Sequence, residues 1–102
     1  MQDVLNIQKT IEDGKAAFSL EGRLDTTTAP DLEAELKSSL GDVTELTLDL
    51  EKLEYISSAG LRVLLSAQKI MSRQGDMRVF NVNETLMEIF EVTGFSDILT
   101  IE

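Results

Sequence analysis

Segments with strand periodicity and segments with helix periodicity alternate along this chain of 102 residues, and this alternation constrains the fold more than any other feature. Residues 45–50 alternate strictly between polar and apolar side chains, which indicates a strand with one buried face. Residues 32–40 carry leucines at helical spacing, and a second helical pattern begins around residues 57–60 and runs to about Gln74. Strands that alternate with helices favour a mostly parallel sheet with right-handed crossovers.

The two ends of the chain complete this pattern. Apolar alternation on both sides of Asp13-Gly14 predicts an amino-terminal hairpin with a tight turn. Residues 77–82 predict a fourth strand, Asn83 caps a third helix, and residues 98–101 predict a last strand. The predicted fold is therefore a single α/β domain over residues 1–102, with the order β-β-α-β-α-β-α-β. Its mostly parallel sheet has four or five strands and an antiparallel edge hairpin at the amino terminus.

An excess of acidic residues excludes several classes of partner. Nine basic and nineteen acidic residues give a net charge of −10, which repels nucleic-acid phosphates and anionic lipid surfaces. The apolar runs are far shorter than a membrane span, and the first residues lack the features of a signal peptide. We therefore expect a cytoplasmic protein without nucleic-acid or membrane partners, and the charge favours a soluble monomer.

The composition contains neither histidine nor cysteine. Without histidine no Ser-His-Asp site can form, and the commonest ligand of transition metals is missing. Without cysteine there are no disulfides and no thiol chemistry. The sequence also lacks the Asp/Asn/Gly loop that binds calcium. We therefore expect no metal site, no cofactor and no enzymatic activity.

Ser58 lies where a strand-to-helix loop meets the start of the second predicted helix. In α/β sheets, functional residues collect at such junctions, after the carboxyl ends of strands. The residues around Ser58 leave two compatible interpretations open. Its hydroxyl can cap the helix, or it can be an exposed kinase acceptor at a helix end that favours phosphate. Asp25 lies in the other such loop, after the second strand, where an acidic residue is usually a turn or capping residue.

The second predicted helix has a narrow polar stripe that carries Arg62, Lys69 and Arg73. Such a stripe is usually a solvated face, although here it could pair with an acidic partner. Val63, Ala67 and Ile70 widen the apolar arc beyond what one sheet face would cover. We therefore expect part of this helix to face a partner.

The segment Tyr-Ile-Ser-Ser-Ala-Gly-Leu at residues 55–61 resembles the phosphorylation loop of bacterial anti-sigma factor antagonists, which are STAS domain proteins. Less specific matches are Gly-Arg-Leu-Asp at residues 22–25, the leucine-rich strand with Asp49, and Phe-Glu-Val-Thr-Gly-Phe at residues 90–95. Together they cover essentially the whole chain. The resemblance implies a STAS-type fold over residues 1–102 and a regulatory role.

The resemblance also implies a switch with named parts. Ser58 would accept phosphate from a serine kinase that is itself the anti-sigma factor, with the Asp25 carboxylate beside it. The unphosphorylated protein would bind this kinase and free a sigma factor, and a PP2C-type phosphatase would act on the phosphorylated form. The expected partner-binding residues are Asp25, Thr26, Ser57, Ser58, Ala59, Gly60, Leu61 and Arg62.

Two positions depart from the pattern of that family. Ser57 stands where an aspartate commonly precedes the acceptor, and Ala59 stands where serine or threonine is frequent. The change at Ser57 leaves the choice of kinase open and makes Ser57 a competing acceptor.

Two other hypotheses stand beside this switch. In the first, the chain is a constitutive STAS adaptor in a larger signalling or transport assembly, and Ser58 is only a helix cap. In the second, Ser58 is a catalytic nucleophile assisted by Lys52 or Lys69. The second is the weakest of the three, because no Gly-x-Ser-x-Gly motif surrounds Ser58.

Overall fold

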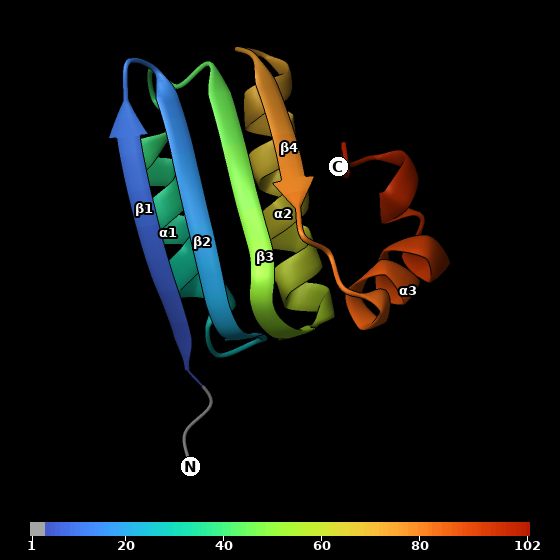
Figure 1. Cartoon of the computed structure of the whole chain (residues 1–102). Coiled ribbons are helices and arrows are strands. Elements are labelled where there is room, and N and C mark those ends of the chain that lie inside the picture. Colours follow the sequence, from blue (N-terminus) through green and yellow to red (C-terminus); the bar gives the residue numbers. More distant parts are fainter. Residues whose placement is uncertain (1–3) are drawn as a thin grey trace.

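The predicted amino-terminal hairpin forms one edge of a four-stranded sheet (Figure 1). In the computed structural model, which describes residues 4–102, its two strands pair antiparallel over the whole length of the first. Asp13 and Gly14 join them with φ angles of 51° and 79°, the left-handed backbone that a type I′ turn requires. The elements are β1 (Leu5–Glu12), β2 (Lys15–Leu24), α1 (Ala29–Ser39), β3 (Glu45–Ile56), α2 (Ser58–Ser72), β4 (Asp76–Phe80), α3 (Glu84–Thr93) and the 3-10 helix η1 (Phe95–Asp97).

The strands lie in the order β1-β2-β3-β4, with β2, β3 and β4 parallel to one another. Helices α1 and α2 are the crossovers between these parallel strands. The predicted α/β fold, a mostly parallel sheet with an antiparallel edge hairpin, is confirmed.

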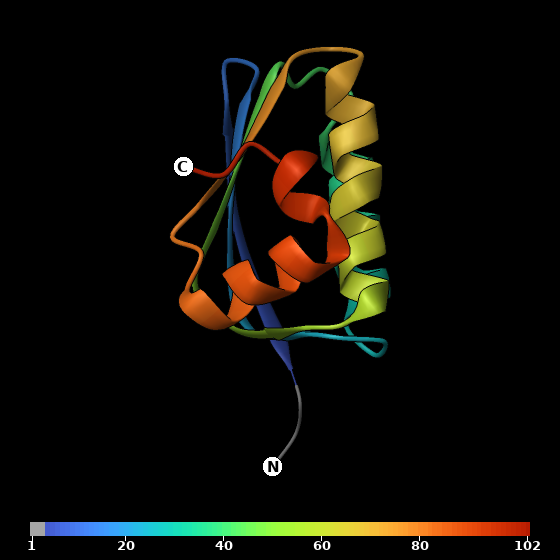
Figure 2. The same cartoon turned by 90° about the vertical axis from the view of Figure 1, so that its right-hand side faces the viewer.

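Helices α1 and α2 lie on the same side of the sheet, and α3 lies beyond the edge strand β4 and runs from the level of the sheet towards α2 (Figure 1 and Figure 2). The core fills the space between them and the sheet, with Phe18 and Leu48 from the strands meeting Leu32, Leu64 and Phe90 from the helices. Each of these side chains is at most 1% exposed. Burial of one such side chain stabilises the fold by roughly 1.5–3 kcal/mol. The opposite face of the sheet carries polar side chains and is not covered by the described residues.

The wide apolar arc of α2 is covered within the molecule rather than by a partner. Val63 and Ala67 are 5% and 1% exposed, and α1 packs beside α2. Ile70 is partly buried against the same core. The width of this arc is therefore no sign of a partner, because the prediction considered one sheet face and no neighbouring helix. That another part of α2 faces a partner stays a prediction.

Strand β3 is longer than its pattern predicts. The alternation ends at Leu50, whereas the strand continues to Ile56. Two register shifts against β2 insert extra residues into β3. The spacing of buried residues consequently changes from two to three, through Leu50, Leu53 and Ile56, which conceals the strand in the sequence.

The predicted last strand is reduced to a single parallel bridge between Val79 and Ile101. Val79 donates a hydrogen bond to the carbonyl oxygen of Thr100 and accepts one from the amide of Glu102, at 2.8 and 2.9 Å. Ile98 still has helical dihedral angles after η1, so too few residues remain to form a strand.

Within residues 4–102, no helix has the length and apolarity needed to cross a membrane.

Candidate functional site

The carboxyl ends of β2 and β3 lie side by side, and both predicted functional loops start there. Leu24 and Ile56 are register partners at the ends of these strands. The amide of Ser57 donates a hydrogen bond of 2.9 Å to the carbonyl oxygen of Leu24. This bond ties the start of α2 to the end of β2, so Asp25 and Ser58 belong to one site.

The two adjacent serines have different environments. Ser57 is the N-cap of α2, with extended dihedral angles, and its Oγ accepts a long hydrogen bond of 3.4 Å from the amide of Gly60. Ser58 is the first helical residue and is exposed. Its hydroxyl makes no hydrogen bond to any other residue within 4–102. The predicted capping role therefore belongs to Ser57, because α2 begins one residue earlier than a cap at Ser58 would require.

Gly60 permits α2 to start against the sheet. A Cβ atom at this position would lie 2.7 Å from Leu24 Cγ and 2.8 Å from Ile56 Cγ1. Real Cβ contacts are essentially never that short. The glycine is therefore required for close packing of the start of α2.

The Asp25 carboxylate organises the turn between β2 and α1. Its Oδ1 accepts hydrogen bonds from the amides of Thr27 and Thr28, at 3.0 and 3.1 Å. Its Oδ2 lies 3.8 Å from Arg23 Nε, and the carboxylate side chain is only 17% exposed. The turn interpretation of Asp25 is confirmed, whereas a direct role beside the acceptor stays a prediction.

The remaining predicted binding residues differ in what they offer to a partner. Thr26 and Arg62 are exposed, Ala59 is half-buried, and Gly60 and Leu61 are buried, with Leu61 7% exposed. Gly60 and Leu61 therefore support the site from the core and do not form its surface. A shallow groove runs between the starts of α1 and α2 and is lined by Thr26, Ala29, Pro30, Glu33, Ala59, Arg62, Val63 and Ser66.

An aromatic contact beside the serines was not predicted. The Arg23 guanidinium lies over the ring of Tyr55, 4.4 Å from its centroid. Such a cation–π contact holds the arginine in place and leaves Tyr55 37% exposed. The two residues are register partners on β2 and β3, and the bulges in β3 hide that pairing from the sequence.

The charges on α2 lie along its outer face. Arg62, Lys69 and Arg73 are exposed and form no ion pair with another residue in the described part of the chain. The first turn of α2 contains no acidic residue. This end of α2 therefore combines the positive end of the helix dipole with an unpaired arginine.

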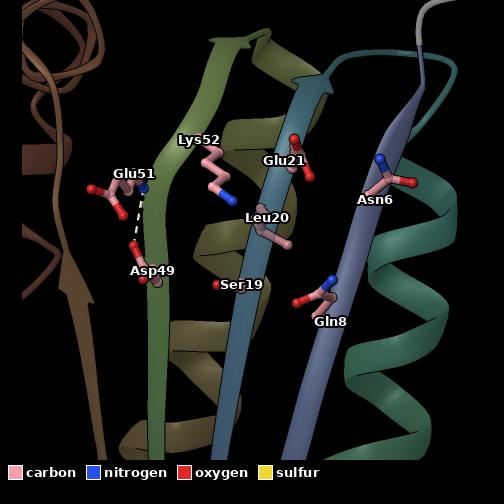
Figure 3. A pocket seen from close by; sticks show the side chains of 8 residues that line it. All are labelled: Asn6, Gln8, Ser19, Leu20, Glu21, Asp49, Glu51 and Lys52. Atoms are coloured by element: carbon pink, nitrogen blue, oxygen red, sulfur yellow. Dashed lines mark hydrogen bonds between the residues drawn. The ribbon is translucent and has the colours of Figure 1, made fainter.

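A separate polar hollow lies on the open face of the sheet (Figure 3). Asp49 Oδ1 accepts hydrogen bonds of 3.0 Å from the Glu51 amide and from Asn81 Nδ2, so this carboxylate serves the bulge in β3. None of the expected partner-binding residues lines the hollow, and it is not part of the site. Lys52, the candidate helper of Ser58 in the enzyme hypothesis, lies here instead. Its lining residues are Asn6, Gln8, Ser19, Leu20, Glu21, Asp49, Glu51 and Lys52.

Comparison with known proteins shows the family to which this chain belongs. A family model described as STAS domain matches residues 6–102. The chain belongs to the STAS domain family. The resemblance predicted from the serine loop is therefore confirmed at the level of the family.

Named relatives extend the comparison. The chain is 37% identical over 91 residues to BtrV of Bordetella bronchiseptica, named as a candidate anti-sigma factor antagonist, covering 87% of this chain and 78% of BtrV. It is 34% identical over 83 residues to the anti-sigma-B factor antagonist of Listeria monocytogenes, covering 79% and 73% of the two chains. The fold matches that of an anti-sigma factor antagonist from Mycobacterium paratuberculosis with a TM-score of 0.88 at 22% identity, over 99% of this chain and 87% of the other.

Proposed function

We propose that this STAS domain protein is an anti-sigma factor antagonist that is switched by phosphorylation of Ser58. The observation that carries the proposal is the exposed Ser58 hydroxyl at the start of α2, which the fold does not use. Two relatives with more than 30% identity carry names of this functional class. Its partner is an anti-sigma factor serine kinase, and the two proteins meet in the cytoplasm. With a charge of −10, the protein works as a monomer.

The surroundings of the serines favour Ser58 over Ser57 as the acceptor. The Oγ of Ser57 is partly buried and accepts the capping hydrogen bond, so a phosphate there would remove a contact of about 1 kcal/mol. Ser58 requires no such rearrangement. A phosphate on Ser58 also meets the positive end of the dipole of α2.

The chemistry belongs to the partners. The kinase supplies ATP and the catalytic base, the Ser58 Oγ attacks the γ-phosphorus, and ADP leaves. A PP2C-type phosphatase hydrolyses the phosphoserine, which releases inorganic phosphate and restores the hydroxyl. Each phosphate adds about −1.5 to −2 charge next to the groove between α1 and α2. Charge and bulk at this position would keep the kinase from docking.

Phosphorylation in vitro tests the proposal directly. The protein is incubated with ATP and an anti-sigma factor kinase encoded beside its gene, and the phosphate is located by peptide mass spectrometry. We expect phosphate on Ser58, none on Ser58→Ala, and normal phosphorylation of Ser57→Ala. Absence of phosphate from both serines would refute the switch.

Binding measurements separate the switch from the adaptor hypothesis. Ser58→Ala should bind the kinase persistently, whereas Ser58→Asp should bind it poorly. A stable complex with proteins that lack a kinase fold, unchanged by Ser58→Glu, would favour the constitutive adaptor. The enzyme hypothesis would require labelling of Ser58 by an activity-based serine probe.

A further inference from the structure

We infer that Arg62 binds the phosphate carried by Ser58 and leaves the docking groove when it does so. This inference rests on the proposed phosphorylation of Ser58 and names the residue of this chain that responds to it. The observations are the spacing of the two residues on α2, their exposure, and the absence of an ion pair at Arg62 within residues 4–102.

Helix geometry brings the two side chains together. Ser58 is the first residue of α2, and Arg62 follows one turn later on the same face. A long side chain on a helix points back towards the preceding turn, so Arg62 is able to reach Ser58 from its own position. The planar guanidinium can donate two parallel hydrogen bonds to phosphate oxygens.

The other cations near the phosphate are less suitable. Arg23 is held by the Tyr55 ring and the Asp25 carboxylate. Lys69 lies eleven residues beyond Ser58, about 16 Å along the helix axis, which exceeds the screening length at physiological salt. Arg62 is therefore the cation that meets the phosphate.

The same arginine lines the groove between α1 and α2 in the unphosphorylated protein. Pairing with the phosphate turns its side chain towards the start of α2. Phosphorylation thereby adds a negative charge and withdraws a positive one from the surface where the partner docks. One covalent event changes two features of that surface.

The acid–base behaviour of the phosphate reports this pairing. A cation beside the phosphate stabilises the dianion and lowers its second pKa, so loss of that cation raises the pKa. Other charged or titratable groups surround this end of α2, and they are the same in each variant compared. They are Arg23 and Asp25 from β2 and its loop, Glu54 and Tyr55 from β3, and Glu33 from α1.

Phosphoserine placed at position 58 during translation gives the test a substrate that needs no kinase. The phosphorus resonance is titrated with pH in the wild-type phosphoprotein and in Arg62→Gln, Arg62→Lys and Lys69→Gln, at physiological ionic strength. We expect Arg62→Gln to raise the phosphate pKa by about 0.2–0.4 pH unit, from the strength of ion pairs four residues apart on a helix. Arg62→Lys should recover part of the difference, and Lys69→Gln should match the wild type.

Two results would overturn the pairing. One is an identical pKa for Arg62→Gln and the wild type. The other is an equal rise in Arg62→Gln and Lys69→Gln, which would assign the effect to net charge. The difference should also shrink in concentrated urea, because it depends on the helix, and full persistence there would contradict the geometry. Failure of a kinase to modify Ser58 would refute the proposed function without affecting this titration.

Discussion

Replacement of Gly60 by alanine should destabilise the protein although alanine is the better helix former. The added methyl would lie 2.7 Å from Leu24 Cγ, 2.8 Å from Ile56 Cγ1 and 3.0 Å from the carbonyl oxygen of Leu24. Leu24 and Ile56 are 0% and 2% exposed, so neither can move outwards. The Leu24 carbonyl is also held by the Ser57 amide.

The expected magnitude follows from two opposing effects. Overpacking of a core costs about 1–3 kcal/mol, and three close contacts place this site in the upper part of that range. The gain in helix propensity offsets up to about 1 kcal/mol. The net loss in the free energy of unfolding is therefore about 1–2 kcal/mol, which lowers Tm by roughly 5–10 °C in a domain of this size.

Urea unfolding followed by far-UV circular dichroism measures this loss. Gly41→Ala is the matched control, because a Cβ there meets no atom within 4 Å and its φ is not in the left-handed region. We expect the control to lie within about 0.5 kcal/mol of the wild type, or to be slightly more stable. A Gly60→Ala protein as stable as the control would refute the close-packing argument.

Three further predictions concern stability, each measured by the same urea unfolding. Asp25→Ala should lower the free energy of unfolding by about 1–2 kcal/mol, since the amides of Thr27 and Thr28 lose their acceptor. Asp25→Asn should retain most of the stability, and equal losses in the two variants would contradict this role. Asn83→Ala should lose a similar amount, because Asn83 caps α3 through the Leu86 amide at 2.9 Å; Asn83→Asp, which keeps the cap, is its control. Phe90→Ala should lose about 3–5 kcal/mol from the core, whereas Val92→Ala on the same helix, 84% exposed, should change little; comparable losses would refute the placement of α3.

Local chemistry explains why much of the fold could be predicted from the sequence. The Asp13-Gly14 turn requires left-handed backbone at two successive residues, and few other pairs adopt it so readily. Asn83 caps α3 through its own side chain, and Gly94, with a φ of 81°, ends that helix. Each of these signals lies within a few residues of the structure that it predicts.

The errors arose where a distant part of the chain decides the local structure. The end of β3 is recognisable only against β2, since two bulges change its spacing of buried residues. The burial of Val63 depends on α1 packing beside α2. At the site, the sequence predicted the correct junction, but the cap is Ser57, one residue before the predicted one, because the bond to Leu24 fixes where α2 begins. The stack of Arg23 on Tyr55 likewise depends on strand register.

The connection between β3 and α2 consists of one residue, Ser57. The proposed acceptor therefore has no slack with which to enter a kinase cleft as an extended peptide. A kinase that modifies Ser58 has to recognise a folded surface assembled from β2, β3 and α2, rather than a linear motif. A synthetic peptide spanning the same residues would present none of that surface. Substrate specificity in such a pathway therefore depends on the folded structure rather than on the local sequence.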